Sequence, residues 1–230
     1  MRKLLLIISM VALVAMSDNV QAQNARFGVK MSPSFDWAST GSVASKNEGL
    51  GLGVNLGLVY DHYFTNYMAV SSGVNFNFLR MKYMFTDYRY VNEFLEPTDV
   101  AVSRRLKATN VEIPLKMKFK MDVMGSLKAY MEAGAGLSFN SRDRAKDTYD
   151  FYWESVSTKD YEDCTSQYRL LQASIIFGLG AELEINSKFS AFAQLTFDHS
   201  LSNAFVNSLE KQTGSLIRNN FLGIEVGIMH

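Results

Sequence analysis

Along most of the chain, apolar residues alternate with small or polar ones. The clearest example is 49–60, where leucines, a valine and a tyrosine alternate with glycines and an asparagine. An alternation with a period of two is typical of β-strands, whose successive side chains point to opposite faces of the sheet. The stretches that show it are 26–36, 49–60, 68–78, 110–120, 127–139, 173–184, 189–198 and 222–228. The pattern therefore predicts an all-β protein with eight strands.

The connections between these stretches are alternately long and short. The long ones cover residues 37–48, 81–108, 140–167 and 199–218, and the others are short turns. Each stretch is close to the ~9–11 residues that a tilted strand needs to cross the hydrocarbon layer. We therefore predict an eight-stranded antiparallel up-and-down transmembrane β-barrel, with short periplasmic turns and four long extracellular loops.

The first residues have the organisation of a secretory signal peptide. Arg2 and Lys3 precede an apolar core, and Ala22 ends a cleavage site before Gln23. The core is shorter than the ~20 apolar residues that a membrane-spanning helix needs. We expect residues 1–22 to be a signal peptide and residues 23–230 to form one outer-membrane β-barrel domain.

Charge and cysteine content exclude several classes of function. The chain has 23 basic and 23 acidic residues, and removal of the signal peptide leaves 21 and 22. A balance so close to neutral argues against a nucleic-acid partner. Cys164 is the one cysteine, and His62, His199 and His230 are far apart in the sequence, so neither an intramolecular disulfide nor a metal site is predicted. No cofactor is expected.

The same alternation would suit a soluble barrel with an apolar interior, but two features favour a membrane. The less apolar face combines glycines with charges, which fits the interior of an eight-stranded barrel that side chains fill. The predicted lumenal charges are Lys30, Glu112, Lys116, Lys118, Lys128, Glu132, Glu182, Glu184 and Glu225. Aromatic residues also gather at the strand ends, as interfacial girdles do. They are Tyr60, Tyr63, Phe64 and Tyr67 at one end, and Phe35, Phe78, Phe139 and Phe197 at the other.

The strand pattern also predicts two contacts inside the barrel. A tight turn near residues 123–124 would place Lys116 opposite Glu132, and the next hairpin would place the ring of Phe192 over Gly180. A lumen filled in this way should not conduct ions as a porin does.

One segment suggests an enzyme. FDHSLSNAF, at the end of the seventh stretch, is similar to the His-x-Ser-Asn segment of outer-membrane lipid A deacylases, which would make His199 a base and Ser202 a nucleophile. The spacing departs by one residue, which in a strand turns the serine to the other face. Ser200 could substitute as the nucleophile, but no asparagine follows it. We favour the interpretation that this segment is the polar start of a loop, and we predict no enzymatic activity.

The strand NVEIPLKMKFK, a turn and then KAYMEAGAGLSF resemble the paired signature of the PorT-like outer-membrane β-barrel family of Bacteroidetes. This resemblance implies the outer membrane of a Gram-negative, Bacteroidetes-like bacterium and contact with outer-membrane lipid. It also implies insertion by the β-barrel assembly machinery and an accessory role in type IX protein secretion, with partners bound through the long loops. His230 departs from the aromatic residue that usually ends such barrels. The alternatives are a lipid A-modifying hydrolase and a surface adhesin or ligand-binding barrel.

Overall fold

The computed structural model describes residues 25–41, 45–89, 98–150, 155–157, 160–186, 188–206 and 214–230. The predicted signal peptide and its cleavage site at Ala22 and Gln23 lie outside these residues, as do parts of the four predicted long loops. Among the described residues, no helix has the length and apolar character needed to cross a membrane.

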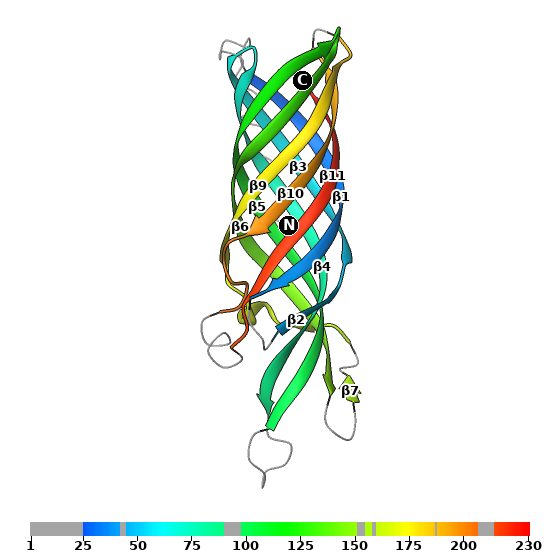
Figure 1. Ribbon diagram of the computed structural model, residues 1–230, viewed down its shortest axis with the longest axis vertical. Coiled ribbons are helices and arrows are strands. Elements are labelled where there is room, and N and C mark those ends of the chain that lie inside the picture. The colour runs from blue at the N-terminus through cyan, green and yellow to red at the C-terminus, as the bar shows by residue number, and fades with distance from the viewer. Residues whose placement is uncertain are drawn as a thin grey trace, which may run out of the picture.

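Eight long antiparallel strands close into a barrel, as the sequence predicted (Figure 1). They are β1 (Ala25–Thr40), β3 (Gly51–Thr65), β4 (Met68–Arg89), β5 (Thr98–Met124), β6 (Leu127–Asp150), β9 (Leu171–Glu184), β10 (Ser190–Ser200) and β11 (Ile217–Met229). Around the ring the order is β4-β3-β1-β11-β10-β9-β6-β5, and pairing of β4 with β5 closes it. Shorter elements are β2 (Ser45–Gly49), β7 (Ser155–Ser157), β8 (Glu162–Asp163) and the 3-10 helix η1 (Thr165–Gln167).

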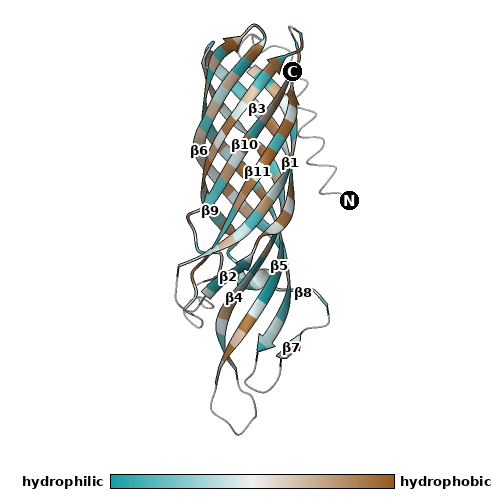
Figure 2. Cartoon of the chain, turned by 45° about the vertical axis from the view of Figure 1, so that its right-hand side comes forward, coloured by the Kyte–Doolittle hydropathy of each residue, from teal (hydrophilic) through white to brown (hydrophobic). Residues whose placement is uncertain are grey.

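The outer wall of the barrel is apolar. Leu52 is 66% exposed, Leu115 63% and Leu179 63%, and large apolar side chains on other strands are similarly uncovered. Figure 2 shows hydrophobic and hydrophilic residues alternating along the strands of this wall. A continuous apolar surface of this size on a closed barrel is stable only against lipid, which covers it in place of water.

Three strands run far beyond the barrel wall. β4 has 22 residues, β5 has 27 and β6 has 24, whereas the other strands of the ring have 11 to 16. Figure 1 shows them continuing past the end that is opposite the chain's C-terminus. The predicted loops 81–108 and 140–167 were therefore wrong over residues 81–89, 98–108 and 140–150, which are strand. In the predicted loop 37–48, β1 runs to Thr40 and β2 begins at Ser45.

The prediction failed because the alternation continues but its polarity is inverted. Along β4, the inward positions change from Asn75 and Asn77 to Leu79 and Met81, all buried. At the same point the outward positions change from phenylalanine to Arg80 and then lysine. β5 changes in the same way at the same level, where Phe78 pairs with Thr109. On β6 the outward face becomes basic from Arg142, which pairs with Thr109, but its inward face still holds buried Asp143 and Asp147 beside Ala145. Outside the membrane the outer face meets water, so the inner face supplies the apolar core.

We call this part of the molecule the cap. It comprises the ends of β4, β5 and β6 beyond Phe78, Thr109 and Asn140, together with β2, η1 and residues 201–206. An apolar core lies where the cap meets the barrel, and it is built from cap residues together with residues of β1 and β11. Its buried members are Ala38, Leu79, Met81, Tyr83, Phe85, Val102, Leu106, Ala108, Ala145, Cys164, Tyr168, Ala204, Phe205, Ile217 and Phe221.

Phe205 is at the centre of the cap core. Its side chain is fully buried, and its ring centroid lies 5.5 Å from that of Phe85 and 5.4 Å from that of Tyr168. Residues 201–206, which follow β10, are thereby packed against both the long β4 strand and the segment next to η1.

We expect Phe205→Ala to loosen the cap while the barrel stays folded. Loss of a buried phenylalanine typically costs ~3–5 kcal/mol, and the ring packs on cap residues rather than on the barrel wall. Limited proteolysis of the folded protein in detergent should cut the cap faster, with the barrel fragment intact. Leu201→Ala is the control, because Leu201 is 51% exposed. Equal cleavage rates for the two variants would contradict the assigned core.

Candidate functional site

The charged residues predicted for the lumen fall into two groups. Lys30, Glu112, Lys116, Lys118, Glu132, Glu182 and Glu225 lie inside the barrel, with side chains that are buried or nearly so. Lys128 and Glu184 lie at the rim instead, where their side chains are 26% and 40% exposed and form an ion pair of 2.7 Å.

Ion pairs fill the half of the lumen near the short turns. The Nζ of Lys118 lies 2.7 Å from Asp61 Oδ2, and the Nζ of Lys120 lies 2.6 Å from Glu182 Oε2. Glu182 also pairs with Arg26 and accepts a hydrogen bond of 2.8 Å from the Ser190 hydroxyl. Charges in such an interior are stable only when opposite charges and hydrogen bonds compensate their desolvation.

Two further lumenal pairs complete the network. Lys30 Nζ donates to both carboxylate oxygens of Glu225 at 3.0 Å, and Lys116 pairs with Glu132. The predicted register was off by two residues, because Lys118 lies directly across from Glu132 and Lys116 lies across from Gly134. Lys116 reaches Glu132 diagonally, past a glycine that has no side chain in the way.

Three further members of this network were not predicted from the sequence: Arg26, Asp61 and Lys120. The alternation in the sequence nevertheless indicates Asp61 and Lys120. Asp61 continues the glycine face of 49–60, and Lys120 continues the face that holds Lys116 and Lys118. Extending each inward face to the end of its strand would have found both residues.

Aromatic and aliphatic side chains block the lumen beside the ion pairs. Val59, Tyr130, Phe192 and Met229 form a buried cluster, and Lys118 Nζ lies 4.3 Å from the centroid of the Tyr130 ring. The predicted contact between Phe192 and Gly180 was wrong. A Cβ at Gly227 would lie 2.5 Å from the Phe192 ring, whereas one at Gly180 would meet Gln194 and Tyr130. Each glycine thus makes room for a ring that comes from a neighbouring strand.

Nearer the cap, the lumen is polar with few cations. Glu112 accepts hydrogen bonds from the amides of Asn75 at 3.0 Å and Asn77 at 3.3 Å. The Ser174 hydroxyl lies 3.3 Å from Glu112 Oε1 and 2.9 Å from Asp198 Oδ2, so it links the two carboxyl groups. Side chains therefore link strands that are not neighbours in the ring, such as β5 and β9 through Glu112 and Ser174.

One of the predicted girdle residues faces inward. The Tyr63 hydroxyl lies 3.4 Å from Asp61 Oδ2, and Lys120 Nζ lies 4.6 Å from the centroid of its ring. Phe64 and Tyr67 are on the outside, 59% and 54% exposed. The girdle prediction for Tyr63 was wrong because the residue shares the lumenal phase of Asp61, two positions before it.

The structure separates the candidate catalytic residues. His199 Nδ1 lies 2.5 Å from Asn220 Oδ1, and Ser202 Oγ accepts a hydrogen bond of 3.1 Å from the backbone N–H of Ala173. Ser200 is buried on the lumenal face, and its hydroxyl donates to the Ser202 carbonyl. Within the described residues, no hydrogen bond joins His199 to either serine, and no cluster of three His, Cys, Asp or Glu residues is arranged to hold a metal.

Polar groups inside the cap fix its segments to one another. Arg104, on β5, donates two hydrogen bonds of 2.8 and 2.6 Å to the Asp147 carboxylate on β6 and one of 2.6 Å to Gln167 in η1. Tyr168 next to η1 is hydrogen-bonded to the hydroxyl of Tyr83 on β4. Burial raises the pKa of the neighbouring Cys164 thiol to about 12, so this thiol is protonated at neutral pH.

A closed barrel with a lipid-facing apolar wall and a filled, charged lumen defines an integral β-barrel protein of an outer membrane. A family model described as the outer membrane protein beta-barrel domain matches residues 21–206. The chain belongs to this family, which places it in the outer membrane of a Gram-negative bacterium. The comparison with curated proteins found no match.

Solved structures of other barrels are similar to the chain. Neisserial surface protein A has 11% identity and a TM-score of 0.42, over 88% of this chain and 95% of that one. Ail, the attachment invasion locus protein of Yersinia pestis, has 11% identity and a TM-score of 0.38, over 90% and 100%. OprG from Pseudomonas aeruginosa has 9% identity and a TM-score of 0.44, over 90% and 95%. The family assignment rests on the family model.

We expect Glu182→Gln to destabilise the barrel strongly. The change leaves Lys120 and Arg26 facing each other in the lumen without their shared carboxylate, and breaking a buried ion pair typically costs ~3–5 kcal/mol. Urea unfolding of the protein in lipid vesicles measures this cost. Glu184→Gln is the matched control: its partner is the rim residue Lys128, and exposed pairs contribute ~1 kcal/mol or less. A loss no larger than that of the control would contradict the network.

We also expect the folded protein to lack porin-type conductance. Ion pairs and the ring cluster of Tyr130 and Phe192 occupy the lumen, and the interior of an eight-stranded barrel is only wide enough for side chains to fill it. Single-channel recording in planar bilayers, with a general porin as positive control, tests this. Stable, long-lived open states with the ohmic conductance of a water-filled pore would show that the packed lumen is not the membrane-embedded state.

Proposed function

We propose that the protein is a non-enzymatic scaffold of the outer membrane, in which the barrel anchors the cap and the cap binds other proteins at the cell surface. The observation that carries this proposal is the continuation of β4, β5 and β6 into a folded unit built on an apolar core. Short turns of outer-membrane barrels are periplasmic and long connections extracellular, so the cap would face the outside. The packed lumen argues against transport through the barrel.

The cap is suited to binding because it is preorganised. Arg104 ties three of its segments together, and Phe205 packs across them. A surface that is already ordered loses little conformational entropy when a partner binds. Loops without a core would have to be ordered at that step.

More specifically, we propose that the protein is a PorT-like protein of Bacteroidetes and an accessory component of type IX secretion. The resemblance on which this rests lies in the barrel. Within NVEIPLKMKFK, Glu112 and Lys116 face the lumen, and Ile113 and Leu115 face lipid. The barrel itself requires residues of these types at these positions, whatever the protein does. The secretion role therefore has to be tested independently of the fold.

The alternatives are a surface adhesin or ligand-binding barrel and a lipid A-modifying hydrolase. An adhesin would use the same cap and differ only in its partner. A hydrolase would need His199 and Ser202 to meet, whereas each is hydrogen-bonded to another residue. The three functions differ in what a strain without the protein would lose.

We expect a deletion strain to accumulate type IX cargo proteins in the periplasm, and the wild-type gene to restore secretion. A second complementing allele should replace residues 84–103 by a two-residue Asn-Gly turn, joining the cross-strand partners Tyr83 and Arg104. This allele shortens the cap hairpin and leaves the barrel strands below Phe78 unchanged. It should insert, as shown by a heat-modifiable band, without restoring secretion.

Normal cargo secretion in the deletion strain would overturn the secretion role. Altered lipid A in that strain, reproduced by His199→Ala or Ser202→Ala, would favour the hydrolase. Lost attachment to host cells or glycans with both secretion and lipid A unchanged would favour the adhesin.

A further inference from the structure

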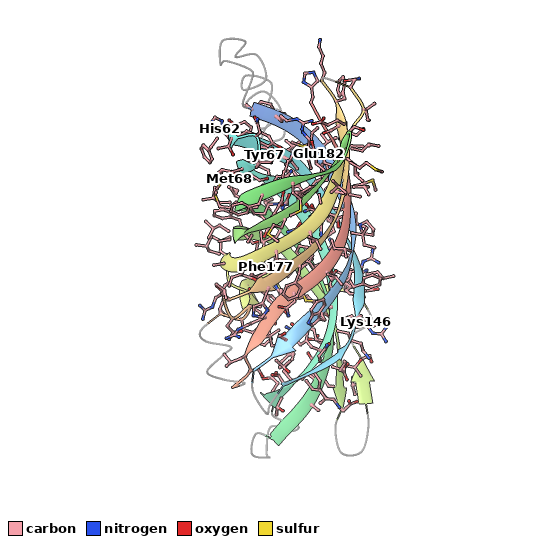
Figure 3. The ribbon with its side chains drawn as sticks, turned by 45° about the horizontal axis from the view of Figure 1, so that its top comes forward. His62, Tyr67, Met68, Lys146, Phe177 and Glu182 are labelled. Carbon is pink, nitrogen blue, oxygen red and sulfur yellow. The ribbon has the colours of Figure 1, made fainter. Side chains whose placement is uncertain are left out.

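The outward face of the cap, just beyond the apolar belt, is strongly basic. Its cations are Arg80 and Lys82 on β4, Arg105 and Lys107 on β5, and Arg142, Arg144 and Lys146 on β6. We call this surface the basic face. Arg80, Arg105 and Lys107 are exposed, as are Arg142 and Arg144. Figure 3 shows Lys146 near the end of the molecule opposite Tyr67 and Met68, so the basic face lies away from the short turns.

Strand pairing aligns these cations in two rows. Arg80 pairs with Lys107 and Lys107 with Arg144, which gives the first row. In the second row Lys82 pairs with Arg105 and Arg105 with Lys146. Directly opposed residues on neighbouring strands have Cβ atoms about 4.5–5.5 Å apart, where like charges repel each other. The cations within each row of three therefore repel one another, and a bound external anion would reduce this repulsion.

Among the described residues, acidic side chains lie beside two cations of the basic face, Lys82 and Arg144. Glu48 Oε2 lies 3.7 Å from Lys82 Nζ, and Asp163 pairs across strands with Arg144, next to the exposed Glu162. Lys107 Nζ lies 3.8 Å from the centroid of the Tyr161 ring, a contact that leaves its charge uncompensated.

The depth of the first row matches the lipid headgroups. Phe78 is the last outward apolar residue of β4 before two cations, Arg80 and Lys82, which follow it on the same face. Outward residues on one strand are ~7 Å apart, or ~5 Å along the membrane normal at a tilt of ~40°. The polar layer of a bilayer is ~5–7 Å thick on each side. Counted from Phe78, the first row therefore lies ~5 Å out, within this layer, and the second ~10 Å out, just beyond it.

We propose that the basic face binds the phosphate groups of the glycolipid that forms the outer leaflet, through the row of Arg80, Lys107 and Arg144 and the row above it. Arginine offers a planar fork of donors for phosphate oxygens, and lysine adds point charges between the forks. A chain of phosphorylated headgroups around the barrel is the anionic surface that lies at this depth. This inference needs the outer-membrane location and the extracellular orientation of the cap, and it does not depend on the scaffold role.

The test is equilibrium binding of fluorescent bisphosphorylated lipid A to the full-length folded protein in a neutral detergent. Each cation near a membrane surface contributes ~1 kcal/mol, which corresponds to a roughly fivefold change in affinity. Lys107→Gln should therefore weaken binding about fivefold, and Arg80→Gln with Lys107→Gln about 25-fold. Binding should also weaken as salt rises.

The matched control is Lys188→Gln, which removes an exposed lysine at the short-turn end and should leave affinity unchanged. Heat-modifiable mobility in gels checks that each variant is folded. Dephosphorylated lipid A should bind the wild type no better than the double variant binds the phosphorylated form. Equal binding of both lipids by the wild type would overturn the proposal without recourse to any variant. Inorganic phosphate that competes at the same concentration as the lipid would also overturn it, since the site would then serve a free anion.

Discussion

The structure depends on one requirement: in hydrocarbon, every backbone N–H and C=O must find its partner within the protein. A sheet satisfies it only when it closes, and here the pairing of β4 with β5 removes the last two edges. Closure around eight strands leaves a narrow interior. The same requirement therefore fixes how many side chains the lumen must hold and how tightly they must pack.

The packed lumen determines what kind of function the barrel can support. Charges such as Lys118 and Glu182 are placed so that each is within reach of an opposite charge, and rings such as Phe192 fit against glycines that leave room for them. Side chains in such an interior hold the strands together. For this reason we place recognition on the cap, which lies beyond the apolar wall.

Polarity inverts where the strands leave the lipid, and this inversion connects the fold to both proposals. The inward face of β4 and β5 becomes apolar and contributes to the core around Phe205, which stabilises the cap. The outward face becomes polar and carries the rows that begin at Arg80. One alternation pattern thus places an apolar core on the inward face of the cap and a cationic surface on its outward face, and each of the two proposals rests on one of them.

The barrel, its eight strands and the inward phase of Glu112, Lys116 and Lys118 were predictable from the sequence, because a period of two assigns faces residue by residue without knowledge of neighbours. Register, ring placement and the ends of β4, β5 and β6 were not. Lys118 opposite Glu132 depends on the turn that joins their strands, and Phe192 beside Gly227 depends on which strands become neighbours in the closed ring. Local alternation sets which way a side chain points, and only closure of the sheet decides what it meets.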